Sequence, residues 1–259
     1  MGDTMQADKP MHEDGRTYHL ETRSGDLAAR CLLVGSPERA QMIAETLFKE
    51  AKLMGDHRGL RSYTGEFNGL SLSVVTTGMG SASIGIVLPE AVASGARAFV
   101  RVGTCGFLQK EGQIGDAGIF TGAVRLDGAS ENWAPIEYPA VADYRLVYAL
   151  VKAAEKSNHP YHVGIGATTT CFNEGQGRPD KNGYLPERLR LQHEELVARG
   201  VKFYSMEEAT LFVWCSTHGG YPAAAVDAVI NNRQTNEFRV AGEMAAAEIA
   251  CWALAGFDL

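Results

Sequence analysis

Short apolar runs rich in β-branched residues alternate with longer amphipathic stretches along the chain from Arg30 onward. The short runs have the length and composition of strands, and the longer stretches have the spacing of helices. This alternation is typical of an α/β fold, in which helices pack against a central sheet. The expected strands cover 31–35, 70–78, 98–103, 118–126, 162–170, 202–206 and 221–231, and the expected helices begin at Pro37 or cover 81–95, 143–157, 186–200, 207–219 and 238–256.

Capping residues mark the ends of two of these helices. Ser36 precedes Pro37, which suits a side-chain N-cap followed by proline in the first helical position. Gly95 is expected to end its helix as a C-cap. The helix over 207–219 is expected to pack through its apolar side.

No repeat or low-complexity linker divides the 259 residues, so we expect one domain over 17–259. Residues 1–16 are polar and are expected to form a mobile tail. The loop over 172–185 is rich in Gly, Asn and Pro, which makes it the best candidate for a mobile active-site segment.

The charge and cysteine content argue against several classes of function. Lys and Arg total 24 against 31 Asp and Glu, and the net charge of −7 gives a field that repels anions and does not favour nucleic acid. An anionic substrate must therefore be bound by local groups. Five scattered cysteines without a CxxC pair indicate reduced thiols in the cytoplasm. We expect neither a membrane span nor a signal peptide, since no apolar run has the required length.

Arginines near glycine-rich turns after two strands mark a candidate anion site. Arg39 lies one turn into a helix after Gly35, so its guanidinium group, the Gly35 N–H and the helix N-terminus can face one anion. Arg101 interrupts an apolar strand, and its burial is costly unless an anion or a carboxylate pairs with it. A structural salt bridge is the alternative for Arg101. Because Gly103 and Thr104 follow closely, we favour an anion site to which Thr104 adds a hydroxyl and a backbone donor.

Two other patterns disfavour common α/β alternatives. The glycine turn over 78–80 does not follow the first strand, and Ser83 stands where a dinucleotide fingerprint has its third glycine, so we expect a close turn against a substrate. The seven histidines have no metal-binding spacing, and no metal is expected. The adjacent His57 and Arg58 are either a phosphate contact or an exposed loop pair.

Motifs in a fixed order cover the chain from Tyr18 onward: YHL, GSPER, HR at 57–58, RVGTCG, the long segment at 124–143, FNEGQGR, SMEEATL and INNR. In number, order and spacing they resemble uridine phosphorylases, within the wider family of nucleoside phosphorylases and nucleosidases. The resemblance implies a single-domain three-layer α/β/α fold with a mixed, partly barrel-like central sheet. It also implies phosphorolysis of uridine to uracil and ribose 1-phosphate, with phosphate as co-substrate and no cofactor.

The resemblance assigns roles to particular residues. The implied phosphate ligands are Gly35, Arg39, Arg101 and Thr104, with Arg58 of a neighbouring subunit. The implied ribose ligands are Met206 and Glu207, with His19 of the partner chain at the 5′ hydroxyl. The implied base ligands are Phe172, Gln176, Arg178 and Arg233. Sites shared in this way imply at least a homodimer.

The reaction chemistry gives these residue types a purpose. The glycosidic bond breaks with positive charge on the sugar and negative charge on the departing base. Arg101 helps to hold phosphate below C1′, Glu207 fixes the ribose, and Arg178 stabilises the uracil anion in place of a general acid. We expect these three residues to carry catalysis. A capping pair at a helix N-terminus is the alternative for Glu207 and Glu208.

Three positions depart from the family pattern. Cys105 replaces a second Thr, and Ser205 replaces a Glu before the Met-Glu pair. Gly59 follows Arg58 where hexameric bacterial enzymes have a cation-binding glutamate, which puts that cation site and the hexamer in doubt.

Four other functions fit the sequence less well. A purine nucleoside phosphorylase would place an acid on the strand that here reads 230–233, whereas Asp227 lies several residues earlier. A nucleosidase would have little use for three converging arginines. A non-catalytic nucleoside-binding protein would not need Glu207 together with those arginines, and a nicotinamide-dependent oxidoreductase lacks its glycine fingerprint here.

Overall fold

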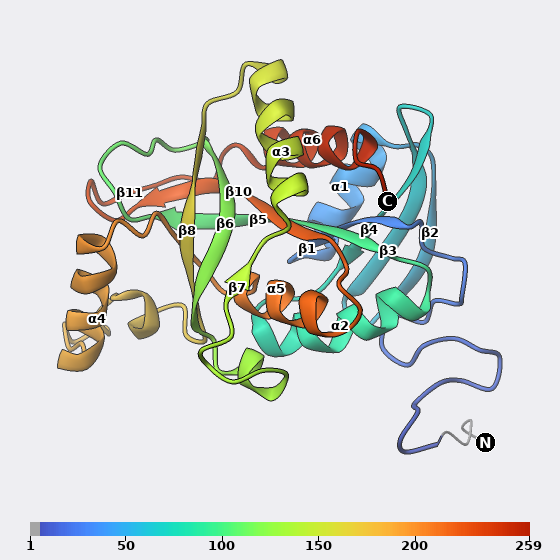
Figure 1. Cartoon of the computed structure of the whole chain (residues 1–259), viewed down its shortest axis with the longest axis horizontal. Coiled ribbons are helices and arrows are strands. Elements are labelled where there is room, and N and C mark those ends of the chain that lie inside the picture. The colour runs from blue at the N-terminus through green and yellow to red at the C-terminus, as the bar shows by residue number, and fades with distance from the viewer. Residues whose placement is uncertain (1–5) are drawn as a thin grey trace.

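Eleven strands form one mixed sheet in the computed structural model, which describes residues 6–259 (Figure 1). The strands are β1 (Arg30–Val34), β2 (Lys49–His57), β3 (Leu60–Phe67), β4 (Leu70–Thr76), β5 (Ala98–Phe107), β6 (Ala117–Leu126), β7 (Ala140–Val141), β8 (Tyr161–Thr169), β9 (Phe203–Ser205), β10 (Ala223–Asn232) and β11 (Glu237–Phe238). The helices are α1 (Pro37–Leu47), α2 (Ser81–Ala93), α3 (Tyr144–Ser157), α4 (Glu187–Ala198), α5 (Glu208–Thr217) and α6 (Glu243–Ala255), with 3₁₀ turns η1 (Ala129–Asn132) and η2 (Glu174–Gln176). Each expected strand and helix has a counterpart.

The sheet closes on itself at one end. Its order is β11-β10-β6-β8-β9-β5-β1-β4-β3-β2, and β7 pairs with β6. A further parallel pairing of β10 with β5 closes strands β5, β10, β6, β8 and β9 into a barrel. Beyond the barrel, β1 lies parallel to both β5 and β4, while β2 and β3 complete the open edge antiparallel to each other. The predicted mixed, partly barrel-like sheet is confirmed.

Helices cover both faces of the sheet (Figure 1). On one face α1, α3 and α6 contribute Ile43, Leu150 and other apolar side chains to a buried core. On the opposite face α2 and α5 contribute Ile84 and Phe212 to a second core. Helix α4 packs beside the barrel through Leu196. The three-layer α/β/α arrangement is therefore confirmed.

Capping explains the ends of the helices nearest to the glycine turns. Ser36 Oγ accepts a hydrogen bond from Arg39 N at 3.2 Å, with Pro37 in the first helical position as predicted. Helix α2 ends at Ala93 with Ser94 as its C-cap, one residue before the predicted cap. Gly95 follows with a φ of 128°, and a Cβ there would lie 2.3 Å from the Leu27 carbonyl oxygen, so glycine is required.

The predicted start of the C-terminal helix is wrong. Phe238 pairs with Asn231 in β11, and α6 begins only at Glu243. Gly242 has a φ of 84°, and a Cβ there would lie 2.5 Å from the Gly115 carbonyl oxygen. This close approach ends the loop and orients the helix, which an apolar periodicity alone does not reveal.

Two other elements differ from expectation. The β2–β3 hairpin was not predicted, because β2 is exposed along its first five residues and has no alternating apolar pattern. Helix α5 does not pack through one side only: every residue from Glu208 to Cys215 is buried. A helix enclosed on all sides shows no amphipathic stripe.

The N-terminal segment runs over the surface beside the β2–β3 hairpin. Met11 and Thr17 form an isolated bridge, and Asp14 pairs with Arg16 at 2.8 Å and with Arg23 at 2.6 Å. Residues 1–5 of the predicted tail lie outside the described part, and the mobility of the tail stays a prediction. Among residues 6–259, no helix has both the length and the apolar character that crossing a bilayer requires.

Candidate active site

A cavity of about 350 Å³ opens where β1 pairs with β5 at the edge of the barrel. Its lining comes from the turns after β1 and β4, from β5, from the loop after β8, and from the ends of β9 and β10. The lining residues are Gly35, Ser36, Pro37, Arg39, Met79, Arg101, Thr104, Cys105, Gly106, Phe172, Gln176, Tyr204, Ser205, Met206, Glu207, Ile230 and Asn231. The structure thus brings most of the predicted site residues to one place, although they are distant in the sequence.

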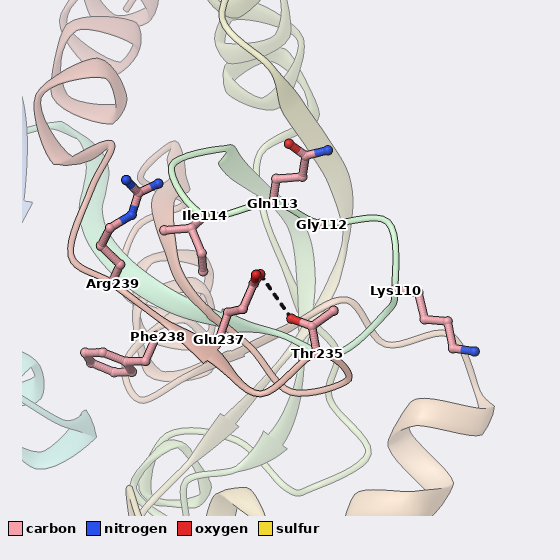
Figure 2. A pocket seen from close by; sticks show the side chains of 8 residues that line it. All are labelled: Lys110, Gly112, Gln113, Ile114, Thr235, Glu237, Phe238 and Arg239. Atoms are coloured by element: carbon pink, nitrogen blue, oxygen red, sulfur yellow. Dashed lines mark hydrogen bonds between the residues drawn. The ribbon is translucent and has the colours of Figure 1, made fainter.

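A larger cavity of about 570 Å³ lies between the 110–114 loop and the β10–β11 turn (Figure 2). Its labelled side chains include Lys110, Thr235, Glu237 and Arg239, and Thr235 donates a hydrogen bond to Glu237 at 3.2 Å. None of the predicted site residues lines it. The smaller cavity is therefore the candidate active site.

Arg39 reaches this cavity from the first turn of α1. Its Nε donates to Glu243 Oε1 at 3.1 Å, and its Nη2 pairs with the same carboxylate at the start of α6. Glu243 was not predicted as a site residue. An arriving anion therefore meets an arginine that already has a carboxylate partner.

Arg101 is held by three carboxylates and is only 5% exposed. Its Nη1 lies 2.8 Å from Asp227 Oδ1 and 3.0 Å from Glu208 Oε1, and its Nη2 donates to Glu207 Oε2 at 2.5 Å. Gly103 makes room for this arrangement, because a Cβ there would lie 1.6 Å from Arg101 Nη1. The salt-bridge alternative and the anion site are thus both compatible with this residue, which is ion-paired and also lines the cavity.

Burial changes the proton affinity of these carboxylates. It raises the pKa of Asp227 well above its usual range, and Arg101 opposes this only in part. Burial likewise raises the pKa of Glu207, again against the attraction of Arg101. Three acids share one guanidinium group, so the cluster favours a state in which at least one acid is protonated.

Glu207 also contacts the glycine turn that follows β4. The Gly80 N–H donates to Glu207 Oε1 at 2.5 Å, and Ser81 Oγ donates to the Met206 carbonyl at 2.8 Å. Glu207 stands at the N-cap position of α5 but makes no side-chain capping bond there. The capping alternative therefore fails for the Glu207 side chain, which contacts Arg101 and lines the cavity, whereas Glu208 Oε2 accepts from the Glu207 N–H at 3.3 Å. The turn over 78–80 lies at the cavity through Met79, which lines it.

Side chains from the 172–178 loop also line the cavity. Gln176 is 3% exposed and its Nε2 donates to Thr169 Oγ1 at 3.2 Å. Arg178 Nη1 donates to Gln176 Oε1 at 2.7 Å, and its guanidinium lies 4.1 Å from the centre of the Phe172 ring. Arg233 Nη2 donates to the Gly177 carbonyl at 3.2 Å. Phe172 and Gln176 line the cavity, whereas Arg178 and Arg233 stand behind them.

The two arginines behind the lining carry positive charge at this end. Burial and the nearby Arg233 lower the pKa of Arg178 to about 10. Tyr204, which lines the cavity, has its pKa raised to about 12 by burial. Its hydroxyl lies 3.0 Å from His193 Nδ1, a contact between β9 and α4 that no sequence motif indicated. The electrostatic environment at this end favours a negatively charged group.

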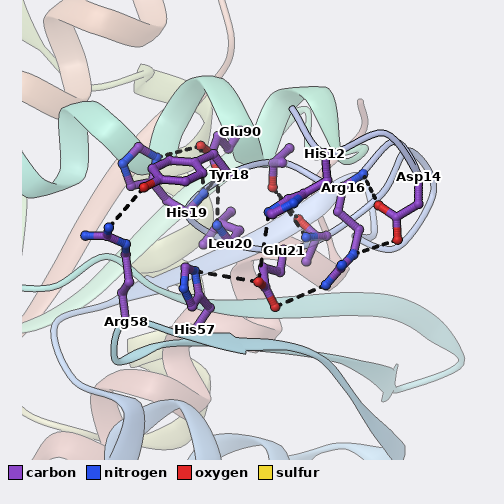
Figure 3. Close-up of polar contacts among 12 residues, drawn as sticks. His12, Asp14, Arg16, Tyr18, His19, Leu20, Glu21, His57, Arg58 and Glu90 are labelled. Atoms are coloured by element: carbon purple, nitrogen blue, oxygen red, sulfur yellow. Dashed lines mark hydrogen bonds and ion pairs between the residues drawn. The ribbon is translucent and has the colours of Figure 1, made fainter. Parts of the chain in front are cut away.

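Arg58 and His19 do not line the cavity of their own chain. Arg58 Nη2 donates to the Tyr18 hydroxyl at 3.1 Å, and His19 Nδ1 lies 2.7 Å from Glu90 Oε1 (Figure 3). Arg58 and Gly59 form a two-residue hairpin turn with φ values of 54° and 77°. Glycine at position 59, where the family pattern has a glutamate, thus suits the positive φ of this turn. Arg58 lies at the tip of an exposed hairpin.

Sequence reasoning missed the acids around the arginines. Glu208 was considered only as a capping residue and Asp227 only as a purine ligand, and Glu243 was not considered. Asp227 could have been noticed as a lone acid in the apolar strand 221–231, since a buried acid needs a cationic partner. Glu243 gave no signal, because a Glu in the first turn of a helix is commonplace.

Comparisons with known proteins identify the family. A profile of the phosphorylase superfamily matches residues 29–255. Uridine phosphorylase of Thermococcus kodakarensis is 43% identical over 246 residues, which cover 95% of this chain and 88% of the relative. Uridine phosphorylase of Escherichia coli is 38% identical over 223 residues, covering 85% and 87%. Guanosine phosphorylase of Halorubrum lacusprofundi is 35% identical over 157 residues, covering 60% and 65%. The chain belongs to the phosphorylase superfamily.

Proposed function

We propose that the protein is an enzyme that cleaves uridine with inorganic phosphate, giving uracil and ribose 1-phosphate. The observation that carries this proposal is the set of groups that line one cavity: Arg39 and Arg101, Glu207 hydrogen-bonded to Arg101, and Gln176. Such a set suits a phosphate, a sugar and a base held in the same cavity. The uridine phosphorylases among its relatives support the choice of base.

The proposed mechanism uses charge and position, with no cofactor or metal. Phosphate lies between the Gly35 N–H, Arg39, Arg101 and Thr104, and attacks C1′ as the base leaves. Glu207 accepts hydrogen bonds from the ribose hydroxyls and fixes C1′ between the two groups. Arg178, through its contact with Gln176, places positive charge where the uracil anion forms.

A purine nucleoside phosphorylase is the second candidate, and the guanosine phosphorylase relative favours it. That reaction requires an acid beside the purine ring. Asp227 is fully buried against Arg101, and the side chains of β10 that line the cavity are Ile230 and Asn231. The acid is thus at the phosphate end, so uridine is preferred.

One comparison of substrates tests both candidates. Release of uracil from uridine and of hypoxanthine from inosine is measured at matched concentrations, with and without phosphate. Our proposal expects faster cleavage of uridine and strict dependence on phosphate. Faster cleavage of inosine favours the purine enzyme, cleavage without phosphate favours a nucleosidase, and tight uridine binding without turnover indicates a non-catalytic binding protein.

We also propose that two subunits share each site. The exposed Arg58 and the half-buried His19 lie outside their own cavity, and the resemblance assigns both residues to a neighbouring subunit's site. Mixing inactive Arg58→Ala and Arg101→Ala subunits tests this. If sites are shared, mixed dimers regain one intact site, and random mixing restores about a quarter of the wild-type activity. No recovery after subunit exchange would contradict shared sites.

The proposed setting is the cytoplasm. Cys31, Cys105, Cys171, Cys215 and Cys251 are free thiols. Four of them are buried, which suits a reducing compartment but does not require one. The proposed partners are uridine, phosphate and further copies of the chain, without nucleic acid or membrane.

A further inference from the structure

Acidic side chains outnumber arginines around the phosphate end of the cavity. Arg101 contacts Asp227, Glu207 and Glu208, and Arg39 contacts Glu243. If all four acids were ionised, two positive charges would face four negative ones. Bound phosphate would add further negative charge to the same few ångströms. Such a site binds an anion only if another cation arrives or if some of the acids are protonated.

Asp227 is the acid whose position best suits a protonated state. It lies at 0% exposure on β10, opposite Gly103 in the register with β5. Oδ1 accepts from Arg101 Nη1, and Oδ2 has no hydrogen-bond partner among the described residues. A buried carboxylate oxygen without a partner disfavours the ionised form.

The groups that face Asp227 come from three elements. Strand β5 presents Arg101 and the Cys105 thiol, helix α5 presents Glu208 together with its N-cap residue Glu207, and helix α1 adds the more distant charge of Arg39. Burial raises the pKa of the Cys105 thiol, so it stays neutral. The two glutamates repel a charge on Asp227 and the arginines attract it. Burial, together with the two glutamates, favours a proton on Asp227.

We propose that Asp227 is a positioning residue that orients Arg101 and keeps a proton while phosphate is bound, so that phosphate affinity falls when this proton is lost. The inference rests on the proposed phosphate site. Asp227 does not line the cavity, so it acts on phosphate only through Arg101. Asp227 Oδ1 holds Arg101 Nη1 in place, so that Arg101 Nη2 is directed toward Glu207 and the cavity.

Sulfate binding at different pH values tests the proposal without any nucleoside. Sulfate keeps the same charge from pH 4 to 10, so a change in its dissociation constant reports on the protein. Titration calorimetry is carried out on the wild type, on Asp227→Asn and on Asp227→Ala. We expect the wild-type dissociation constant to rise with pH by up to about tenfold per unit once the proton is lost.

The two variants separate a proton-holding role from a purely structural one. The amide introduced by Asp227→Asn keeps an oxygen for Arg101 but cannot ionise, so the pH slope should become shallower than in the wild type. Asp227→Ala loses the contact with Nη1, and sulfate should bind about tenfold more weakly at every pH. Asp116→Asn, which changes an Asp that pairs with His162 at 2.8 Å outside the cavity, is the matched control and should keep the wild-type slope.

Two results would overturn the proposal: a wild-type dissociation constant that stays flat from pH 4 to 10, or an equal slope in wild type and Asp227→Asn. The proposed function is judged separately, by phosphate-dependent uracil release in the same preparations. Uracil release without a pH slope removes only the role of Asp227. A slope that depends on Asp227 without uridine cleavage removes only the proposed function.

Discussion

Replacing Arg101 with Ala tests the link between burial and phosphate binding. The wild-type guanidinium contacts three buried carboxylates at 2.5, 2.8 and 3.0 Å and also lines the cavity. Removing a preorganised charge from a site where charge develops costs ~3 kcal/mol of transition-state stabilisation, which is a loss of at least ~100-fold in kcat/KM. The same change leaves three buried acids without their cation, so we expect about 3–5 kcal/mol less unfolding free energy.

The two effects are measured separately. Initial rates of uracil release at varied phosphate give kcat/KM, and urea unfolding followed by circular dichroism gives the free energy and confirms that the variant is folded. Arg101→Lys keeps the positive charge and should recover most of the stability while remaining at least ~10-fold slower, because a lysine cannot reproduce the planar fork of donors. Arg199→Ala removes an exposed arginine that pairs with Glu195 at 3.3 Å, and it should change neither quantity. Wild-type kcat/KM in a folded Arg101→Ala protein would refute the assignment.

Three further outcomes are expected. Gln176→Ala should lower kcat/KM for uridine by about 10-fold or more and narrow the preference for uridine over thymidine and inosine, because Arg178 loses the oxygen that orients it. An unchanged preference for uridine in rate assays would contradict this. Asp143→Ala removes the side-chain cap of α3 and should cost about 1 kcal/mol in urea unfolding with normal activity. Burial raises the pKa of Asp227 and Glu207, so above the ordinary carboxyl pKa range the folded state binds more protons than the unfolded chain. The free energy of unfolding should therefore fall as pH rises through that range, and it should fall less steeply in Asp227→Asn. Equal slopes in the two proteins would argue against the cluster.

The sequence predicts the architecture better than the contacts inside it. Apolar periodicity indicated the strands and helices that enclose the cores, since those elements bury one face or both. It failed for β2, an exposed strand with few apolar residues, and for the start of α6, where Gly242 packs against the Gly115 backbone. The start of α6 depends on a contact between distant segments, whereas β2 pairs with the neighbouring β3 but has no apolar face, and a local apolar pattern reveals neither.

The candidate site illustrates the same limit. Arg101 and Arg125 both interrupt apolar strands and are both buried. Arg125 donates to the carbonyls of Ala134, Pro135 and Tyr138 in a loop, whereas Arg101 pairs with acids and lines the cavity. The glycine and threonine after Arg101 favoured an anion site, and this assignment stays a prediction. The identity of its partners required the pairing of β5 with β10, which brings Asp227 opposite Gly103.

A crystal structure with bound sulfate would test most directly the claim that the arginines of this cavity bind an oxyanion. We expect one sulfate in contact with the Gly35 N–H, Arg39, Arg101 and the Thr104 hydroxyl, with Arg58 of a neighbouring subunit completing the site. Arg39 should move from Glu243 toward the anion. If Arg39 and Arg101 keep only their carboxylate partners and sulfate is found elsewhere, the account is wrong.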